Sequence, residues 1–195
     1  MRFVPNLFRP LMVMLAISIA SKAIHAEESA KPTAQAPPKV GDMAKTFTLQ
    51  SLDGEEVELK KLLKQGPVVV AVLRGYPGYQ CPACTRQVGG YVKLADDFMK
   101  AKATVVFIYP GEAKDLETRA QEFLKQTELP APLTLVLDPD HRFVTATGLR
   151  WEALNETAYP STFIVDADGK VTFRKVSKSH GDRAEAADVL NALLR

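Results

Sequence analysis

Apolar and amphipathic segments alternate along the chain from residue 40 onward. Three apolar runs, at residues 68–73, 104–109 and 133–137, are each followed within two residues by Gly or Pro and predict buried strands. Residues 82–101 and 113–127 carry apolar side chains at helical spacing, which predicts helices between these strands. Gly89-Gly90 interrupts the first helix, which indicates a kink or a close helix crossing, or alternatively a hinge.

Two short hairpins are predicted on either side of this alternating region. One pairs residues 46–49 with 56–58 around a turn at Asp53-Gly54, and the other joins 161–165 to 171–175 through Asp166-Ala-Asp-Gly169. Short helices are predicted at 59–65 and 142–147, with a closing helix at 182–195. This order predicts an α/β fold with a central mixed β-sheet and helices on both faces.

The N-terminal segment has a different character. Arg2 and Arg9 give it a basic start, residues 11–20 are apolar or small, and small residues at 21, 23 and 26 offer cleavage sites, which predicts a signal peptide over residues 1–26. An uncleaved anchor is the alternative, although a spanning helix needs roughly 20 apolar residues. Residues 27–38, rich in Ala, Pro and charge, predict a flexible linker before one folded domain at 39–195. We therefore expect an exported, periplasmic protein.

The charge of the mature chain bears on its partners. The 195 residues carry 25 basic and 23 acidic side chains, and removal of residues 1–26 leaves 22 basic and 23 acidic ones. The excess of basic residues thus belongs to the export signal, and nucleic acid is a poor candidate partner. We expect contact with a membrane only through the N-terminal signal segment.

Both cysteines lie in a turn-rich segment directly after the first apolar run, Arg74-Gly-Tyr-Pro-Gly-Tyr-Gln-Cys81-Pro-Ala-Cys84-Thr-Arg86. Pro82 suits the first turn of a helix, which places Cys81 at the helix N-terminus, where peptide dipoles favour the thiolate. Cys84 lies about one helical turn further on and can form a disulfide with Cys81. Because a loop this short gives little entropic stabilisation, the spacing favours a redox pair over a structural bridge.

Other residues around this segment have both functional and ordinary interpretations. Arg74 and Arg86 lower the pKa of Cys81 if their side chains turn inward, and are otherwise solvated charges. Tyr76 and Tyr79 line a substrate groove or simply cover the loop. A zinc site is not expected, because the mature chain adds only His141 and His180 to the cysteine pair and neither belongs to a second cluster.

Residues 40–195 resemble the thioredoxin-like superfamily. Within them, Val40-Gly-Asp-Met-Ala-Lys-Thr-Phe-Thr-Leu49 and the Cys81-Pro82 pair resemble the alkyl hydroperoxide reductase/thiol-specific antioxidant (AhpC/TSA, or peroxiredoxin) family, in which this cysteine is peroxidatic. Two family features are replaced. Gly78 and Arg74 stand where peroxiredoxins carry a hydroxyl residue and a proline, and Pro160 stands where they carry an arginine.

The segment Tyr159-Pro160-Ser-Thr-Phe-Ile-Val-Asp166 also resembles the cis-proline segment of thioredoxin-like reductases and oxidases. That resemblance implies that Pro160 packs against the cysteine pair through a cis bond and leaves Tyr159 backbone groups free for a substrate peptide. The alternative is a trans proline that opens an edge strand.

These observations predict an exported thiol-disulfide oxidoreductase. Cys81 attacks a disulfide of a protein partner, Cys84 resolves the mixed disulfide, and no cofactor is required. One alternative is a peroxiredoxin-like peroxidase, with a hydroperoxide as substrate, Cys81 as the peroxidatic residue and Cys84 as the resolving one. The other is a redox-inert binding module that uses the groove around Tyr76, Tyr79 and Pro160. The identities of substrate and redox partner are left open.

Overall fold

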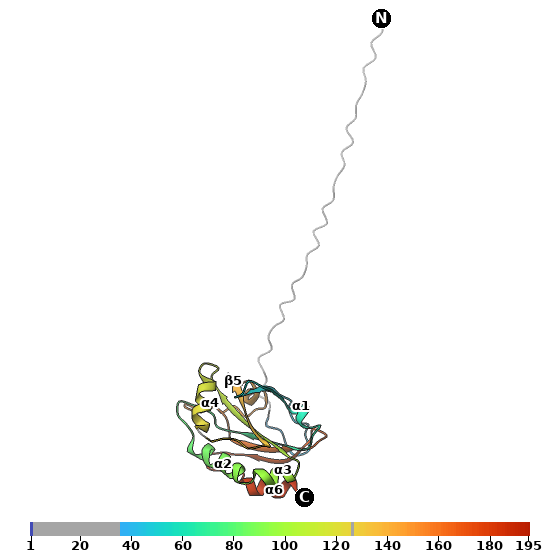
Figure 1. Ribbon diagram of the computed structural model, residues 1–195. Helices are drawn as coiled ribbons and strands as arrows, with labels where there is room; N and C mark the ends of the chain where they lie inside the picture. Colours follow the sequence, from blue (N-terminus) through green and yellow to red (C-terminus); the bar gives the residue numbers. More distant parts are fainter. Residues whose placement is uncertain (2–35, 126) are drawn as a thin grey trace. The chain divides into compact units, whose positions relative to one another are not determined.

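The central feature of the computed structural model is one mixed sheet of seven strands in the order β2-β1-β5-β4-β3-β6-β7 (Figure 1). The structure describes Met1, residues 36–125 and residues 127–195; the predicted signal peptide and most of the predicted linker lie outside them. The strands are β1 (Thr48–Ser51), β2 (Glu56–Glu58), β3 (Val68–Val72), β4 (Thr104–Gly111), β5 (Leu133–Pro139), β6 (Ser161–Val165) and β7 (Val171–Val176). The helices are α1 (Leu59–Leu62), α2 (Pro82–Lys93), α3 (Ala95–Lys100), α4 (Leu116–Leu124), α5 (Arg142–Ala146) and α6 (Ala186–Leu193).

Strand pairing follows the predicted order of elements. Strands β3, β4 and β5 are parallel to one another, and the predicted hairpins form as β1–β2 and β6–β7. Each hairpin joins the parallel core through an antiparallel pair, β1 with β5 and β6 with β3. The mixed sheet is therefore confirmed.

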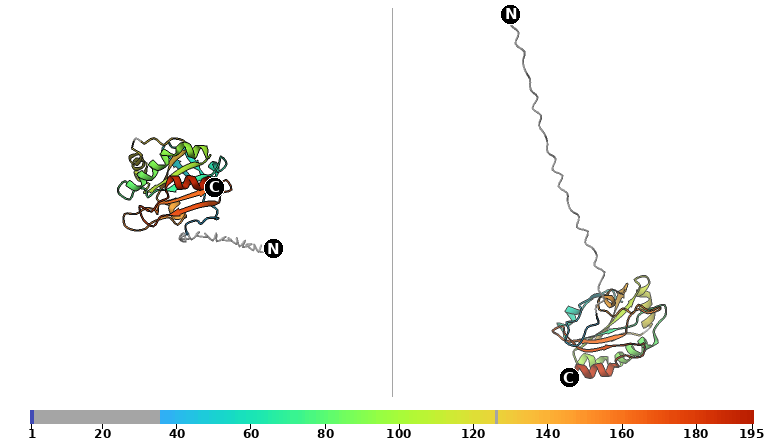
Figure 2. Two further views of the ribbon diagram at one scale, coloured as in Figure 1. Left: turned by 90° about the horizontal axis from the view of Figure 1, so that it is seen from below. Right: turned by 180° about the vertical axis from the view of Figure 1, so that it is seen from behind.

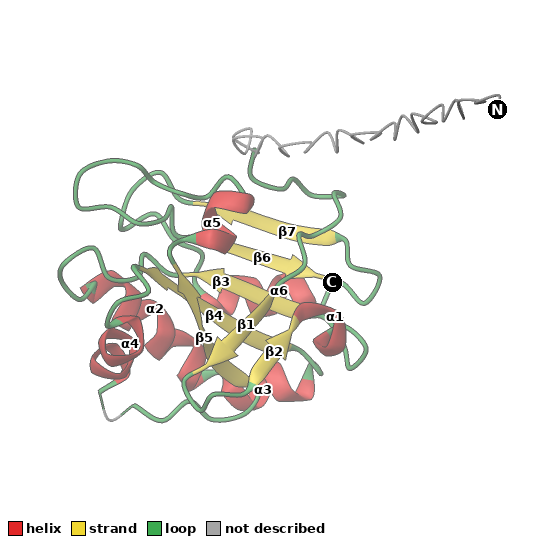
Figure 3. Cartoon of the chain, turned by 90° about the horizontal axis from the view of Figure 1, so that it is seen from above, coloured by secondary structure: helices red, strands yellow, loops and turns green. Residues whose placement is uncertain are grey.

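The two faces of the sheet are covered by different helices. On β3, Val69 and Ala71 belong to a core with α2, α3, α4 and α6, whereas Val68, Val70 and Val72 belong to a second core with α1 and α5. Helices α2, α3 and α6 lie together along one face (Figures 1 and 2), and Figure 3 looks onto the face that carries α5. Burial on both faces explains why β3 is a continuous apolar run.

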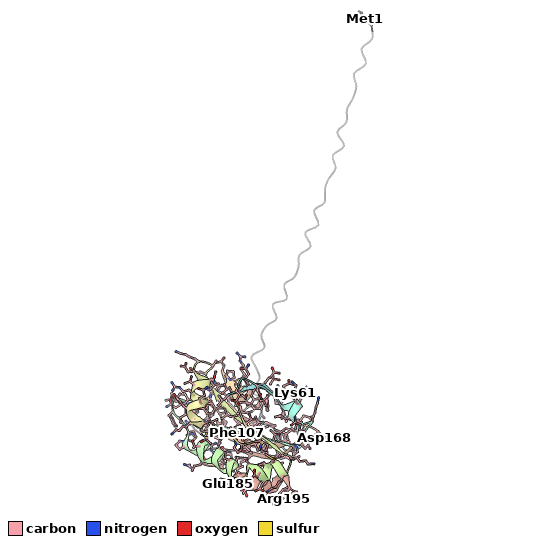
Figure 4. The ribbon with its side chains drawn as sticks, in the orientation of Figure 1. Met1, Lys61, Phe107, Asp168, Glu185 and Arg195 are labelled. Atoms are coloured by element: carbon pink, nitrogen blue, oxygen red, sulfur yellow. The ribbon has the colours of Figure 1, made fainter. Side chains whose placement is uncertain are left out.

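An aromatic group fills the layer between the sheet and α2. Tyr91 of α2 meets Phe107 of β4 edge-on at a centroid distance of 5.4 Å, and it stacks on Phe98 of α3 at 5.4 Å. Phe107 is labelled inside the folded unit in Figure 4. This packing fixes α2, and with it the cysteine segment, against the sheet.

The predicted interruption at Gly89-Gly90 is wrong. Helix α2 continues through both glycines, and the break falls at Leu94, whose φ of −111° and ψ of 15° separate α2 from α3. A Cβ atom at Gly90 would lie 3.6 Å from the Cβ of Ala186. This close approach of α2 and α6 agrees with the interpretation of the pair as a close helix crossing, rather than with the alternative of a hinge.

The closing helix starts later than predicted. Helix α6 begins at Ala186, so that Asp182, Arg183 and Ala184 lie in the preceding loop rather than in the helix. At the other end of the domain, the Pro38 carbonyl accepts a hydrogen bond from Arg174 Nε of β7, at 2.8 Å. Across the residues that the structure describes, none of the helices has the length and apolar character needed to cross a bilayer.

Candidate active site around the two cysteines

The segment between β3 and α2 is held close to the end of β4. The N–H of Tyr76 donates to the Pro110 carbonyl at 3.3 Å, and Gly75 has a φ of +71°. A Cβ atom at Gly75 would lie 1.9 Å from the same carbonyl oxygen. Only glycine therefore fits this point, where the chain turns toward the cysteines.

Helix α2 begins as the sequence predicts, with Pro82 as its first residue and Cys81 as its N-cap. The backbone N–H of Cys84 donates to Cys81 Sγ at 3.3 Å. The hydrogen bond from the Cys84 side chain has the largest effect on the pKa of Cys81, and it lowers that pKa. Burial opposes it, but the Cys84 N–H and the charges of Arg183 and Arg74 add to it, and together they lower the pKa of Cys81 to about 5.

Cys84 has the opposite character. It is completely buried, whereas Cys81 keeps 3% of its surface exposed, and both are free thiols. Its Sγ accepts the backbone N–H of Arg74 at 3.4 Å. Burial is the main reason that the pKa of Cys84 is raised, and the hydrogen bond with Cys81 adds to it. The pair thus divides into an acidic thiol with slight access to solvent and a buried thiol that stays protonated.

Arg183 is the site residue that the sequence did not reveal. Its Nη2 lies 3.6 Å from Cys81 Sγ and 3.4 Å from Cys84 Sγ. Nη1 donates to Gln87 Oε1 at 2.6 Å, and Nε donates to the His180 carbonyl at 2.8 Å. Arg183 lies two residues before Glu185, which Figure 4 labels at the start of α6. No local signal distinguishes it among the 25 basic residues of the chain.

Arg74 turns inward and is only 1% exposed. Its Nε forms an ion pair of 2.6 Å with Glu156 Oε2, and its Nη2 donates to the Asn155 carbonyl at 2.6 Å. The guanidinium lies 4.7 Å from the ring centre of Tyr79. Tyr79 therefore covers this buried charge, in keeping with its interpretation as a residue that covers the loop.

Two further arginines, Arg86 and Arg150, make no contact with the cysteine sulfurs in the described part of the chain. Arg86 is exposed on α2 and takes no part in the sulfur contacts found within the described chain. Arg150 Nη1 donates to the carbonyls of Trp151, Glu156 and Thr157, and so fastens the loop between α5 and β6. Its guanidinium is used in shaping that loop.

The prediction of a cis bond at Pro160 is wrong. Within residues 36–125 and 127–195 the cis bond is at Ala131–Pro132, and Tyr159–Pro160 is trans. The Tyr159 N–H donates to the Leu149 carbonyl at 2.9 Å, and its own carbonyl accepts from Ser161 Oγ at 2.8 Å. The Tyr159 backbone groups are thus used internally and are not free for a substrate peptide. Pro160 is buried and leads directly into β6.

Two further features complete the surroundings of the site. A cavity of about 510 Å³ lies beside the cysteine segment and is lined in part by Tyr76, Gly78, Arg119 and Glu156. The Arg119 guanidinium lies 4.9 Å from the Tyr76 ring centre. Among the described residues, no group of three or more His, Cys, Asp or Glu side chains has the arrangement of a metal site.

Comparison with known proteins points to one family. The model of the AhpC/TSA family matches residues 40–174. A putative peroxiredoxin of Mycobacterium tuberculosis is 34% identical over 136 residues, which cover 67% of this chain and 80% of that protein. Peroxiredoxin Bcp of Escherichia coli is 31% identical over 140 residues, which cover 69% of this chain and 83% of that protein.

The solved structures agree with these sequences. Peroxidoxin BcpB from Mycobacterium tuberculosis superposes with a TM-score of 0.66 at 26% identity, covering 80% of this chain and 97% of that one. A peroxiredoxin-like protein from Aquifex aeolicus shares the fold, with a TM-score of 0.63 at 18% identity over 81% and 87% of the two chains. Together with the acidic, helix-capping Cys81, these matches show that the chain belongs to the AhpC/TSA family and is a peroxiredoxin-like, thiol-dependent protein.

Proposed function

We propose that this protein is a thiol peroxidase in which Cys81 attacks a hydroperoxide and Cys84 resolves the product. The position of Arg183 carries the proposal, because its guanidinium lies 3.6 Å from Cys81 Sγ, close enough to donate a hydrogen bond to a hydroperoxide that the sulfur attacks and so to stabilise the negative charge that develops on its oxygens. The two donors that peroxiredoxins use are replaced here by Gly78 and Pro160. Arg183 supplies a donor from a different part of the chain.

The chemistry proceeds in two steps. The Cys81 thiolate attacks the terminal oxygen of the hydroperoxide, the O–O bond breaks, and the departing alkoxide takes a proton from solvent to leave as an alcohol, so that Cys81 becomes a sulfenic acid. Cys84 then attacks the Cys81 sulfur, and hydroxide leaves with the Cys84 proton as water, forming a disulfide. An external dithiol reduces this disulfide and returns both thiols. The raised pKa of Cys84 keeps that residue protonated until the sulfenic acid forms.

A second candidate is dithiol–disulfide exchange with a protein partner. It is favoured by the i, i+3 cysteine pair, in which Cys84 N–H already contacts Cys81 Sγ. The family relationship supports the peroxidase more strongly. Both functions use Cys81 as nucleophile and Cys84 as the resolving residue, and they differ in the electrophile that Cys81 meets.

Stopped-flow mixing of the reduced protein with hydrogen peroxide, and separately with a disulfide-bonded protein, decides between the two functions. We expect Cys81 to be oxidised by peroxide several orders of magnitude faster than a free thiolate. Cys84→Ser should stop at the sulfenic acid, which dimedone labels, whereas Cys81→Ser should show no fast phase. A peroxide rate equal to that of a free thiolate, with rapid exchange on the protein disulfide, would favour the second candidate.

A further inference from the structure

We propose that Glu156 is a positioning residue for Cys81: its two carboxylate oxygens tie Arg74 to His180 and thereby hold Arg183 against the sulfurs. The inference deepens the proposed function, because it names what sets the reactivity of the same thiol. Glu156 contacts neither sulfur in the described contacts, and acts through the segments on either side of them.

The first link runs through Arg74. Glu156 Oε2 accepts the Arg74 Nε–H at 2.6 Å, and the Arg74 backbone N–H donates to Cys84 Sγ at 3.4 Å. The side chains of Arg74 and Glu156 are 1% and 10% exposed. An ion pair with so little solvent contact has few alternative geometries, so it fixes the start of the cysteine segment relative to the loop that carries Glu156.

The second link runs through His180. Its Nε2 lies 2.8 Å from Glu156 Oε1, and its carbonyl accepts the Arg183 Nε–H at 2.8 Å. Arg183 Nη2 then reaches Cys81 Sγ at 3.6 Å. Arg183 lies in the loop before α6, where no helical hydrogen bond sets its direction. The direction of the Arg183 side chain therefore depends on the residues that anchor this loop, and Glu156 is one of them.

The loop that carries Glu156 is itself well fastened. Arg150 Nη1 donates to the Glu156 carbonyl at 3.0 Å and to the Trp151 carbonyl at 2.6 Å. The Trp151 ring stacks on Tyr159 at 4.7 Å and lies 5.4 Å from the His180 ring. Glu156 thus joins two sulfur-contacting segments from a rigid support. Burial raises the pKa of Glu156, but Arg74 and His180 outweigh it and keep the carboxylate ionised.

The sharpest test substitutes His180, whose side chain is 44% exposed and tolerates replacement better than the buried Arg74. His180→Ala removes the donor to Glu156, whereas His180→Gln offers an amide N–H in its place. We expect His180→Ala to let the Arg183 guanidinium move away from Cys81. The midpoint of the Cys81 thiolate titration, followed at 240 nm, should then rise by about one pH unit, which is the scale of losing one well-placed opposite charge. His180→Gln should remain close to wild type.

Glu156→Gln tests the residue itself. We expect it to raise the same midpoint and, below pH 5, where the thiolate fraction falls in proportion to the shift, to lower the rate of oxidation by hydrogen peroxide by about tenfold. Glu152→Gln, on the exposed part of the same loop, is the control and should leave both unchanged. Trp151 is the single tryptophan of the chain, so its emission reports whether the surroundings of His180 change. If Glu156→Gln fails to fold, the comparison of His180→Ala with His180→Gln still tests the positioning role.

The outcomes separate this inference from the proposed function. If folded His180→Ala and Glu156→Gln proteins titrate and react with iodoacetamide as wild type does, the positioning role of Glu156 is wrong, whatever the peroxidase activity. If the wild-type protein reacts slowly with hydrogen peroxide while the variants still shift the thiolate titration, the positioning role holds and the peroxidase proposal fails.

Discussion

Arg183 Nη2 lies 3.6 Å from Cys81 Sγ although 102 positions separate the two residues in the sequence. The contact brings a permanent positive charge to a thiol that already caps a helix. It also places a hydrogen-bond donor beside the sulfur that would attack the O–O bond of a hydroperoxide. The loop before α6, rather than β6, thus supplies the cationic partner of the reactive cysteine.

The first prediction concerns Arg183. Replacing it by alanine should slow the oxidation of Cys81 by hydrogen peroxide by about two to three orders of magnitude, the usual cost of losing one preorganised donor. Arg183→Lys should keep the positive charge but lose the planar geometry of the guanidinium, so its oxidation rate should lie between those of Arg183→Ala and wild type. Arg86→Ala is the matched control, since Arg86 is exposed on α2 and its loss should leave the rate unchanged. Equal rates for Arg183→Ala and wild type in stopped-flow assays would contradict the assignment.

The second prediction concerns pH. Because the pKa of Cys81 is lowered to about 5, alkylation by iodoacetamide should rise through pH 5 and be level by pH 7. Between about pH 5 and 9 the unfolded thiol binds a proton that the folded one has lost, so the free energy of unfolding should increase with pH across this window. Cys81→Ser, measured by denaturant unfolding at several pH values under reducing conditions, should lack that increase. A parallel pH dependence in both proteins would be inconsistent with a folded-state thiolate.

The third prediction concerns the turn that leads to the cysteines. Gly75→Ala places a Cβ against the Pro110 carbonyl oxygen, at a residue whose φ is positive. The substitution should therefore lower the free energy of unfolding by about 1–3 kcal/mol and disturb the cysteine segment. Gly89→Ala is the opposite case. Gly89 lies inside α2, and an added Cβ would meet no atom within 4 Å. The alanine variant should therefore raise the free energy of unfolding by up to about 1 kcal/mol. Denaturant unfolding of both variants checks the difference in sign.

The fourth prediction concerns export, which we propose from residues 1–26. Protein isolated from its native host should begin between Ala23 and Glu28 and be found in the periplasmic fraction, because an apolar segment of signal-peptide length precedes the small residues there. Intact-mass measurement checks the start of the chain. A full-length mass in the membrane fraction would instead indicate an uncleaved anchor.

Much of the fold could be predicted from the sequence because its signals are local. The apolar run at 68–73, the turn at Asp53-Gly54 and the hairpin around Asp166-Gly169 each depend on near neighbours, and the structure has β3, β1–β2 and β6–β7 at those places. The same holds for Cys81 and Pro82, since a helix start is determined within about one turn of chain. The helix-capping cysteine and its helix could therefore be predicted without coordinates.

The surroundings of Cys81 depended on the tertiary structure. Arg74 meets Glu156 across 82 positions and Arg183 meets Cys81 across 102, and no spacing rule connects residues so far apart. Local resemblance was misleading at Tyr159-Pro160, where contacts with Leu149 and Ser161 accompany a trans bond. The sequence by itself determined which thiol caps a helix and is the more acidic, through backbone dipoles and turn chemistry. Only the packing of two loops against the cysteine segment decided which charges reach that thiol.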